Sequence, residues 1–142
     1  MKVLLDTNVL SEWVKPQPEP NVVSWLKDLD EDQTFLSVIS LGELRAGVEQ
    51  LEPGRRRAHL EAWLDQDLPA RFDGRIVSVD QLVTKEWGVL MAGARRAGQS
   101  IGVVDALLAA TAEVHDFTLA TRNVRHFAAT SIDIVDPWSL PR

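Results

Sequence analysis

The chain alternates between short apolar runs and longer segments in which apolar residues recur at helical spacing. The short runs are rich in leucine and β-branched residues, which is typical of buried strands; they lie at 2–5, 34–39, 75–79, 117–121 and 131–135. The longer segments predict helices at 7–14, 20–29, 40–51, 53–68, 81–97 and 101–114. Strands and helices in this order predict an α/β fold, a three-layer α/β/α domain with a mainly parallel central sheet of about five strands.

Composition narrows the class of protein. At 142 residues the chain is long enough to bury one core, so we expect a single domain over 1–142. The absence of cysteine excludes disulfides and thiolate zinc sites. The net charge of −6 argues against non-specific coating of duplex DNA, which depends on many basic contacts to phosphates. No apolar stretch approaches a membrane span and no signal peptide is apparent, so we expect a cytoplasmic protein.

Polar side chains follow several of the predicted strands directly. Asp6 comes after the first strand, Glu43 lies shortly after the second, and Asn123 follows the fourth. In a parallel α/β sheet the carboxyl ends of the strands meet at one edge, where ligands bind. We therefore expect residues that are distant in the sequence to converge there.

Each of the first two acids also has a purely structural interpretation. Asp6 could cap a helix that begins at Thr7. In the sequence "SLGE", Ser40 could cap a helix while Glu43 reaches back to the amide of Ser40, which is the capping-box arrangement. Gly47 leaves the helix bare beside Glu43, at a place where a ligand could approach.

Asp105 is the most informative acid. It is the only charged residue between Arg96 and Glu113, and its predicted helix is apolar nearly all round, so we expect that helix to be buried. A buried carboxylate must be paired, neutralised or bound to a cation, because an unpaired buried charge is costly. Asp105 could instead start the helix as its cap.

The segments that carry these residues resemble those of PIN-domain proteins, in particular the small ribonuclease toxins of bacterial toxin–antitoxin pairs, the VapC and FitB type. "VLLDTNVLSE" resembles the opening strand and first acid of the family, and "SVISLGELRAGV" the segment with the second acid. "SIGVVDALLAATA" resembles the helix with the third acid, "TLATRNVRHFA" the strand and turn that follow, and "DPW" a typical ending. The resemblance implies one PIN-like domain over the whole chain.

The resemblance also implies a function and a set of site residues. The function is that of a metal-dependent endoribonuclease, with Asp6, Glu43 and Asp105 as catalytic residues and ligands of Mg²⁺ or Mn²⁺. The family often has a fourth acid after "TR", where this chain has Asn123, and Asp116 is a candidate to compensate for it. Carboxylates are the ligands that hard divalent ions choose, so the residue types agree with this chemistry.

Substrate contacts and partners follow from the same resemblance. Thr7, Asn8, Arg122 and Asn123 are the residues expected to bind the RNA substrate. The implied partners are a cognate antitoxin protein and a second copy of the chain in a homodimer, or a larger toxin–antitoxin assembly, with no membrane. Two other functions stay open: a PIN-like binding module with weak catalysis, motivated by Asn123, and a phosphoryl-transfer enzyme with Asp6 as nucleophile.

Overall fold

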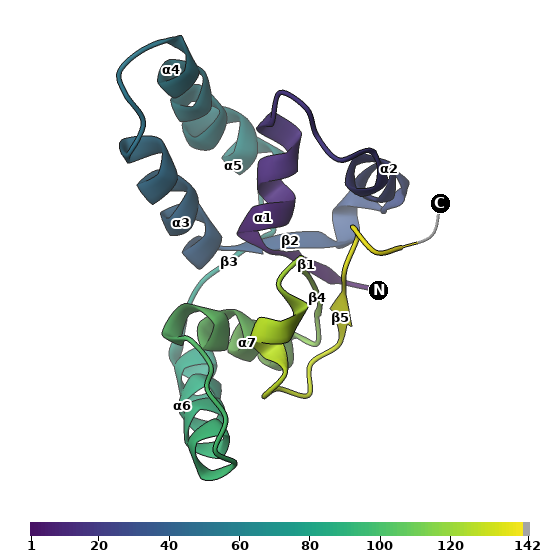
Figure 1. Cartoon of the computed structure of the whole chain (residues 1–142), viewed down its shortest axis with the longest axis vertical. Helices are drawn as coiled ribbons and strands as arrows, with labels where there is room; N and C mark the ends of the chain where they lie inside the picture. Colours follow the sequence, from purple (N-terminus) through teal and green to yellow (C-terminus); the bar gives the residue numbers. More distant parts are fainter. Residues whose placement is uncertain (141–142) are drawn as a thin grey trace.

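A parallel five-stranded sheet forms the centre of the molecule (Figure 1). The structure is a computed structural model and describes residues 1–140. The strands, in the spatial order β3–β2–β1–β4–β5, are β1 (Val3–Leu5), β2 (Thr34–Ser37), β3 (Ile76–Val77), β4 (Thr118–Ala120) and β5 (Ile134–Val135). All neighbouring strands are parallel, so their carboxyl ends lie at one edge, with β1 in the middle. The predicted sheet is thereby confirmed.

Helices cover both faces of this sheet (Figure 1). On one side lie α1 (Thr7–Leu10), α2 (Pro20–Asp28), α3 (Val38–Glu49), α4 (Arg55–Ala62) and α5 (Leu68–Arg71); on the other lie α6 (Gln81–Arg96) and α7 (Val103–His115). Shorter pieces are the 3₁₀ turns η1 (Ser11–Val14), η2 (Glu31–Gln33) and η4 (Val124–Phe127) and the π-helical segment η3 (Trp63–Asp67). Within residues 1–140 no helix is long and apolar enough to cross a membrane.

Two hydrophobic cores, one on each face, hold the layers together. Side chains alternate along a strand, so Val3 and Leu5 of β1 enter one core and Leu4 enters the other. The first core joins the sheet to α1 to α5, and the second joins it to α7 and η4. Because β1 is buried on both faces, its sequence is continuously apolar, as is usual for a central parallel strand.

Several predicted boundaries differ from the observed ones, and two of these differences have a clear local cause. The second strand ends at Ser37, and α3 already begins at Val38, because the hydroxyl of Ser37 accepts a hydrogen bond from the amide of Ile39 at 3.0 Å and caps the helix. The helix predicted over 53–68 is divided into α4, η3 and α5. Pro69 follows the π-helical segment, and its missing N–H interrupts the regular hydrogen bonding of a helix.

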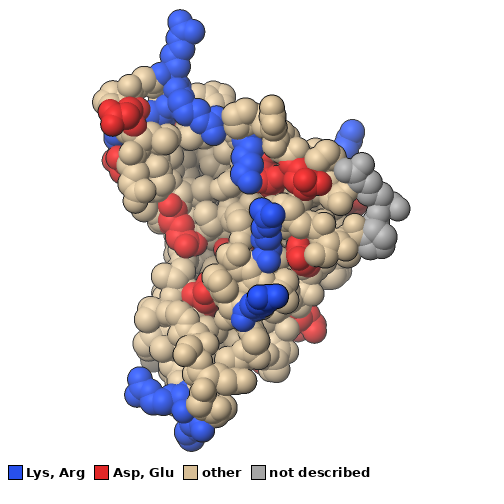
Figure 2. All heavy atoms as spheres, in the orientation of Figure 1, with Lys and Arg blue, Asp and Glu red and all other residues tan. Residues whose placement is uncertain are grey.

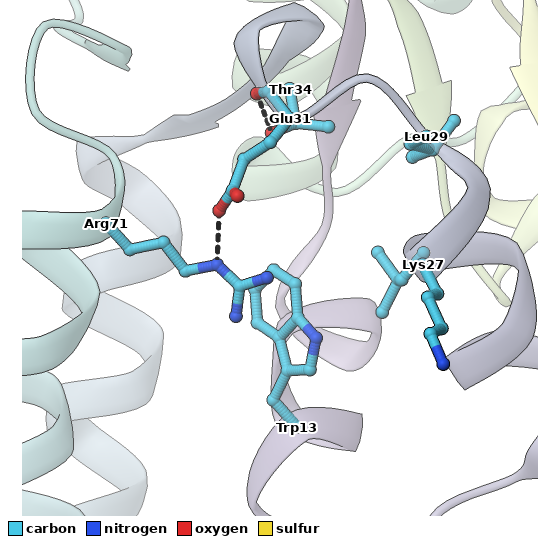
Figure 3. Close-up of a pocket in the computed structure, with 7 residues that line it drawn as sticks. Trp13, Lys27, Leu29, Glu31, Thr34 and Arg71 are labelled. Carbon is cyan, nitrogen blue, oxygen red and sulfur yellow. Dashed lines mark hydrogen bonds and ion pairs between the residues drawn. The ribbon is translucent and has the colours of Figure 1, made fainter.

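A cluster of arginines fixes the amino end of β2. Nη1 of Arg75 donates to the carbonyl of Glu31 at 2.5 Å and to the carbonyl and hydroxyl of Thr34 at 2.7 and 2.9 Å. Nearby, the guanidinium of Arg71 lies 3.9 Å from the ring centre of Trp13 and donates to the carboxylate of Glu31 (Figure 3). The small cavity of about 200 Å³ beside them lies at the opposite edge of the sheet from Asp6, so its charges serve the fold.

Replacing Arg75 by alanine removes two hydrogen bonds to Thr34 at the start of β2 and one each to the carbonyls of Glu31 and Arg71, and leaves these acceptors without that donor. We expect the free energy of unfolding of Arg75→Ala to fall by about 1–3 kcal/mol. The exposed Arg55, replaced in the same way, should change it by less than about 0.5 kcal/mol. Urea unfolding followed by circular dichroism measures both; equal midpoints for the two variants would show that Arg75 does not stabilise this edge.

Candidate active site

Asp6 lies where β1 ends, and it is almost completely buried, with 5% of its surface exposed. Its backbone amide still belongs to the sheet and donates to the carbonyl of Ala120 at 3.0 Å. One carboxylate oxygen accepts the amide of Thr7 at 2.7 Å, and the other accepts the hydroxyl of Thr121 at 2.8 Å. Asp6 therefore caps α1, as the structural interpretation of the sequence suggested, and is also a buried charge.

The environment of Asp6 opposes its ionisation. Burial raises the pKa of Asp6, the hydrogen bonds from Thr121 and Thr7 lower it, and the charges of Glu43 and Asp105 raise it again. The net effect is a pKa above the ordinary value, because burial and repulsion outweigh the two hydrogen bonds. Within residues 1–140 no lysine or arginine forms an ion pair with Asp6. A cation at this place would relieve the repulsion.

Glu43 lies in the second turn of α3 and is exposed. Its Oε1 atom accepts the hydroxyl of Thr7 at 2.6 Å, so Thr7 connects Glu43 with Asp6. The capping-box interpretation of Glu43 is wrong, because α3 begins earlier than the sequence suggested. Ser40 is buried inside the helix, and Ser37 is the cap.

Asp105 lies in the first turn of α7, and the cap of this helix is Gly102, so Asp105 is not the cap. The prediction that α7 is buried throughout is wrong for its first turn. Val103 and Val104 are 56% and 40% exposed, and the side chain of Asp105 is 27% exposed. Burial begins only after Asp105: Ala106 is buried, and the continuous buried run is Leu108 to Ala112. The carboxylate of Asp105 thus faces the carboxyl edge of the sheet from a surface position.

A hydrogen-bonded network joins the remaining candidates. The side chain of Asn8 donates to the hydroxyl of Thr121 at 3.5 Å and accepts the amide of Arg122 at 3.3 Å. The amide of Asn123 donates to the same hydroxyl at 3.1 Å. Thr121 is the residue that the sequence analysis missed here, although its place at the end of β4, beside the expected edge, was a usable signal.

The guanidinium of Arg122 is engaged away from the acids of the site. It lies 5.3 Å from the ring centre of Trp138. Burial would raise the pKa of Glu12, but hydrogen bonds from Lys15 and from the amide of Glu19, with the charges of Lys15 and Arg122, lower it overall. Arg122 is itself exposed, so it lies at the rim of the site with its charge partly directed to Glu12.

Two further residues, Asp116 and His126, complete the description of the site. Asp116 ends α7 at the amino end of β4, so it lies at the opposite edge of the sheet and does not compensate for Asn123. His126, which the sequence analysis did not select, lies with its Nδ1 atom 3.2 Å from Oδ2 of Asp105. Its place depends on how the turn η4 packs against α7, which the sequence pattern does not reveal.

Acidic side chains gather in the hollow on the left of the molecule (Figure 2). Helices α3 and α4 lie above this hollow, and helices α6 and α7 lie below it. A groove of about 400 Å³ lies on the other side of α3, between α3 and α4 and the segment of α1 and η1; Thr7, Glu43 and Gly47 line it together with apolar residues of α3 and α4. A Cβ atom at Gly47 would meet nothing within 4 Å, so this side of α3 is open, as the sequence suggested.

The donor set fits a hard divalent ion that retains water. Among residues 1–140 no three aspartate, glutamate or histidine side chains lie close enough together to hold one ion by themselves. Mg²⁺ in proteins usually keeps several waters and binds one or two carboxylates together with substrate phosphates. The carboxylates of Asp6, Glu43 and Asp105 form no ion pair with a lysine or arginine of the described part of the chain, and their repulsion matches that mode of binding.

The family model described as "PIN domain" matches residues 3–132. The chain belongs to the PIN domain family. It is 38% identical to Toxin FitB of Neisseria gonorrhoeae over 96% of this chain and 98% of that protein, and 35% identical to VapC ribonuclease Y4jK of Sinorhizobium fredii over 96% and 97%. The crystal structure of FitAcB from Neisseria gonorrhoeae superposes with a TM-score of 0.92 at 38% identity, covering 97% of this PIN domain protein and 99% of that chain.

Replacing Asp6 by asparagine should stabilise the protein when divalent ions are chelated. The pKa of Asp6 is higher in the folded than in the unfolded protein, so the ionised side chain lowers stability, and this loss develops as pH rises from about 3.8 through the folded-state pKa. We expect Asp6→Asn to gain about 0.5–2 kcal/mol at pH 7, and the gain to shrink on acidification. Thermal unfolding across this pH range measures it; a variant that is less stable than wild type at pH 7 would contradict the assigned repulsion.

Proposed function

We propose that this PIN domain protein is the ribonuclease toxin of a toxin–antitoxin pair, and that it hydrolyses RNA with Mg²⁺ or Mn²⁺ held by Asp6, Glu43 and Asp105. The observation that carries the proposal is the meeting of three acids from β1, α3 and α7 at one edge of the sheet, where two of them raise the pKa of the third. The relatives named Toxin FitB and VapC ribonuclease Y4jK, which this chain matches over nearly its whole length, support the same activity.

The acidic residues have different roles in the proposed reaction, according to their positions. A bound divalent ion supplies the positive charge that activates a water molecule and offsets the negative charge that develops on the phosphodiester. Asp6, fixed by two hydrogen bonds, and Asp105 would hold this ion. Glu43 is exposed and oriented by the hydroxyl of Thr7, so it is placed to orient the attacking water and to accept its proton.

RNA contacts come from the turn after β4 and the start of α1. Asn123 and Arg122 are exposed, and Asn8 holds this turn through the amide of Arg122. Thr7 and Asn8 open α1, where polar groups can bind a phosphate beside the acids. Basic side chains also lie to the right of the acidic hollow (Figure 2), so a phosphate chain that enters the hollow can meet positive charge at its rim.

The partners of this function are an antitoxin and a second copy of the chain in a homodimer. Support for a protein partner comes from Toxin FitB, which this chain matches over nearly its whole length, and from a structure titled FitAB bound to a DNA fragment, which superposes with a TM-score of 0.92. The second copy is what the family resemblance implies. In this proposal the protein acts in the cytoplasm, as one PIN-like domain over 1–142.

A nucleophilic role for Asp6 is disfavoured by its surroundings. Both of its oxygens already accept hydrogen bonds, and only 5% of the residue is exposed, so a phosphorus atom has little access. The binding-module alternative rests on Asn123 alone. It predicts a protein that binds RNA without cleaving it.

Replacing Asp105 by asparagine tests the assigned site. We expect cleavage of single-stranded RNA in Mg²⁺ or Mn²⁺ to fall by more than about 100-fold, because losing a direct ligand should cost more than losing an outer-shell partner. The matched control is Asp116→Asn, at the other end of the same helix. Asparagine also accepts the left-handed conformation found there at a φ of 55°.

The two variants separate the possible outcomes. Loss of cleavage in Asp105→Asn with retention in Asp116→Asn supports the site. Equal activity of wild type and Asp105→Asn would refute the assigned ligands, and a wild-type protein that binds RNA but does not cleave it in either ion would favour the binding module.

A further inference from the structure

A histidine lies beside the acidic site, in a position that no part of the proposed mechanism uses. The Nδ1 atom of His126 is 3.2 Å from Oδ2 of Asp105, and the side chain of His126 is 56% exposed. The turn η4 places His126 there. The backbone amide of His126 donates to the carbonyl of Asn123 at 3.0 Å, and the next residue, Phe127, is buried in the second core. The anchor on either side fixes the backbone of His126 next to the start of α7.

The spacing of the two atoms is that of neighbouring ligands on one ion. Ligand atoms about 2.1–2.2 Å from an octahedral ion, at right angles to each other, lie about 3 Å apart. The observed separation of 3.2 Å between Nδ1 and Oδ2 is close to this value. The two side chains approach each other as an ion pair.

The chemistry of the turn supports the same use of His126. Asn123 occupies the place where a fourth acid would add a charged oxygen, and its side-chain amide is neutral. The next polar side chain of this turn that reaches the acids is an imidazole, which is a neutral nitrogen donor. Nitrogen donors bind the divalent ions of the first transition row, among which Mn²⁺ binds most weakly, whereas Mg²⁺ prefers oxygen ligands.

We propose that His126 is a nitrogen ligand of the ion bound at Asp105, and that it makes the site select Mn²⁺ over Mg²⁺. This inference rests on the proposed function, since it concerns the same ion. If His126 only oriented the carboxylate of Asp105, its loss would weaken the binding of both ions equally. If His126 is a ligand, its loss weakens the binding of Mn²⁺ more than the binding of Mg²⁺.

Pulsed electron paramagnetic resonance of Mn²⁺ bound to the protein at pH 8 tests the proposal without reference to activity. We expect nitrogen modulation from a bound imidazole in the wild type, its disappearance in His126→Gln, and its retention in His59→Gln. His59 lies on α4, away from the acids, and serves as the matched control. Titration calorimetry should show that His126→Gln loses about 10-fold or more of the preference for Mn²⁺ over Mg²⁺.

The outcomes distinguish the two proposals. Bound Mn²⁺ without nitrogen modulation in the wild type would overturn the role of His126 and leave the ribonuclease proposal intact. A wild-type protein that binds neither ion would overturn both. An unchanged ratio of affinities in His126→Gln would reduce His126 to a residue that orients Asp105, and the wild-type spectrum decides the matter even if the variant folds poorly.

Discussion

A carboxylate buried at the end of the central strand is the constraint on which the rest of this structure depends. Asp6 is accepted there because Thr7 and Thr121 each donate a hydrogen bond to it. Thr121 reaches Asp6 only because β1 and β4 pair in parallel with Leu5 opposite Ala120. A shift of this register by one residue would turn the hydroxyl to the other face of the sheet and leave a buried charge without its donor. The correct register of β1 with β4 is therefore also what places a hydrogen-bond donor beside the buried charge of Asp6.

The two hydrogen bonds do not fully compensate the burial of Asp6, since its pKa is still raised. Proteins retain such unfavourable groups mainly at functional sites and offset them elsewhere in the fold. Here the offset comes from a sheet that is apolar on both faces, with Val3 and Leu5 in one core and Leu4 in the other. The hydrogen bonds from Thr7 and Thr121 also fix the orientation of the carboxylate.

Local patterns in the sequence predicted the five strands, the order of layers and the meeting of the acids at one edge, because buried strands and carboxyl-end sites leave direct signals. They failed where the outcome depends on packing. The "SLGE" segment fitted a capping box, but Ser37 caps α3 three residues earlier. Apolar residues around Asp105 indicated burial, yet Val103 and Val104 are exposed. The approach of His126 depends on how η4 docks on α7, which no spacing rule contains.

The charges at the site explain how the departures from the family pattern fit together. Asp6, Glu43 and Asp105 bring three negative charges to one edge, and one divalent ion offsets only two of them. A fourth acid at position 123 would add to the repulsion that already raises the pKa of Asp6. Asn123 avoids that repulsion but gives up a charged ligand, and the imidazole of His126, three residues on, brings a donor atom that needs no negative charge. Under the proposal for His126, the turn after β4 replaces a charged oxygen by a neutral nitrogen, which would lower the electrostatic cost of the site before an ion binds and would change which ion the site favours.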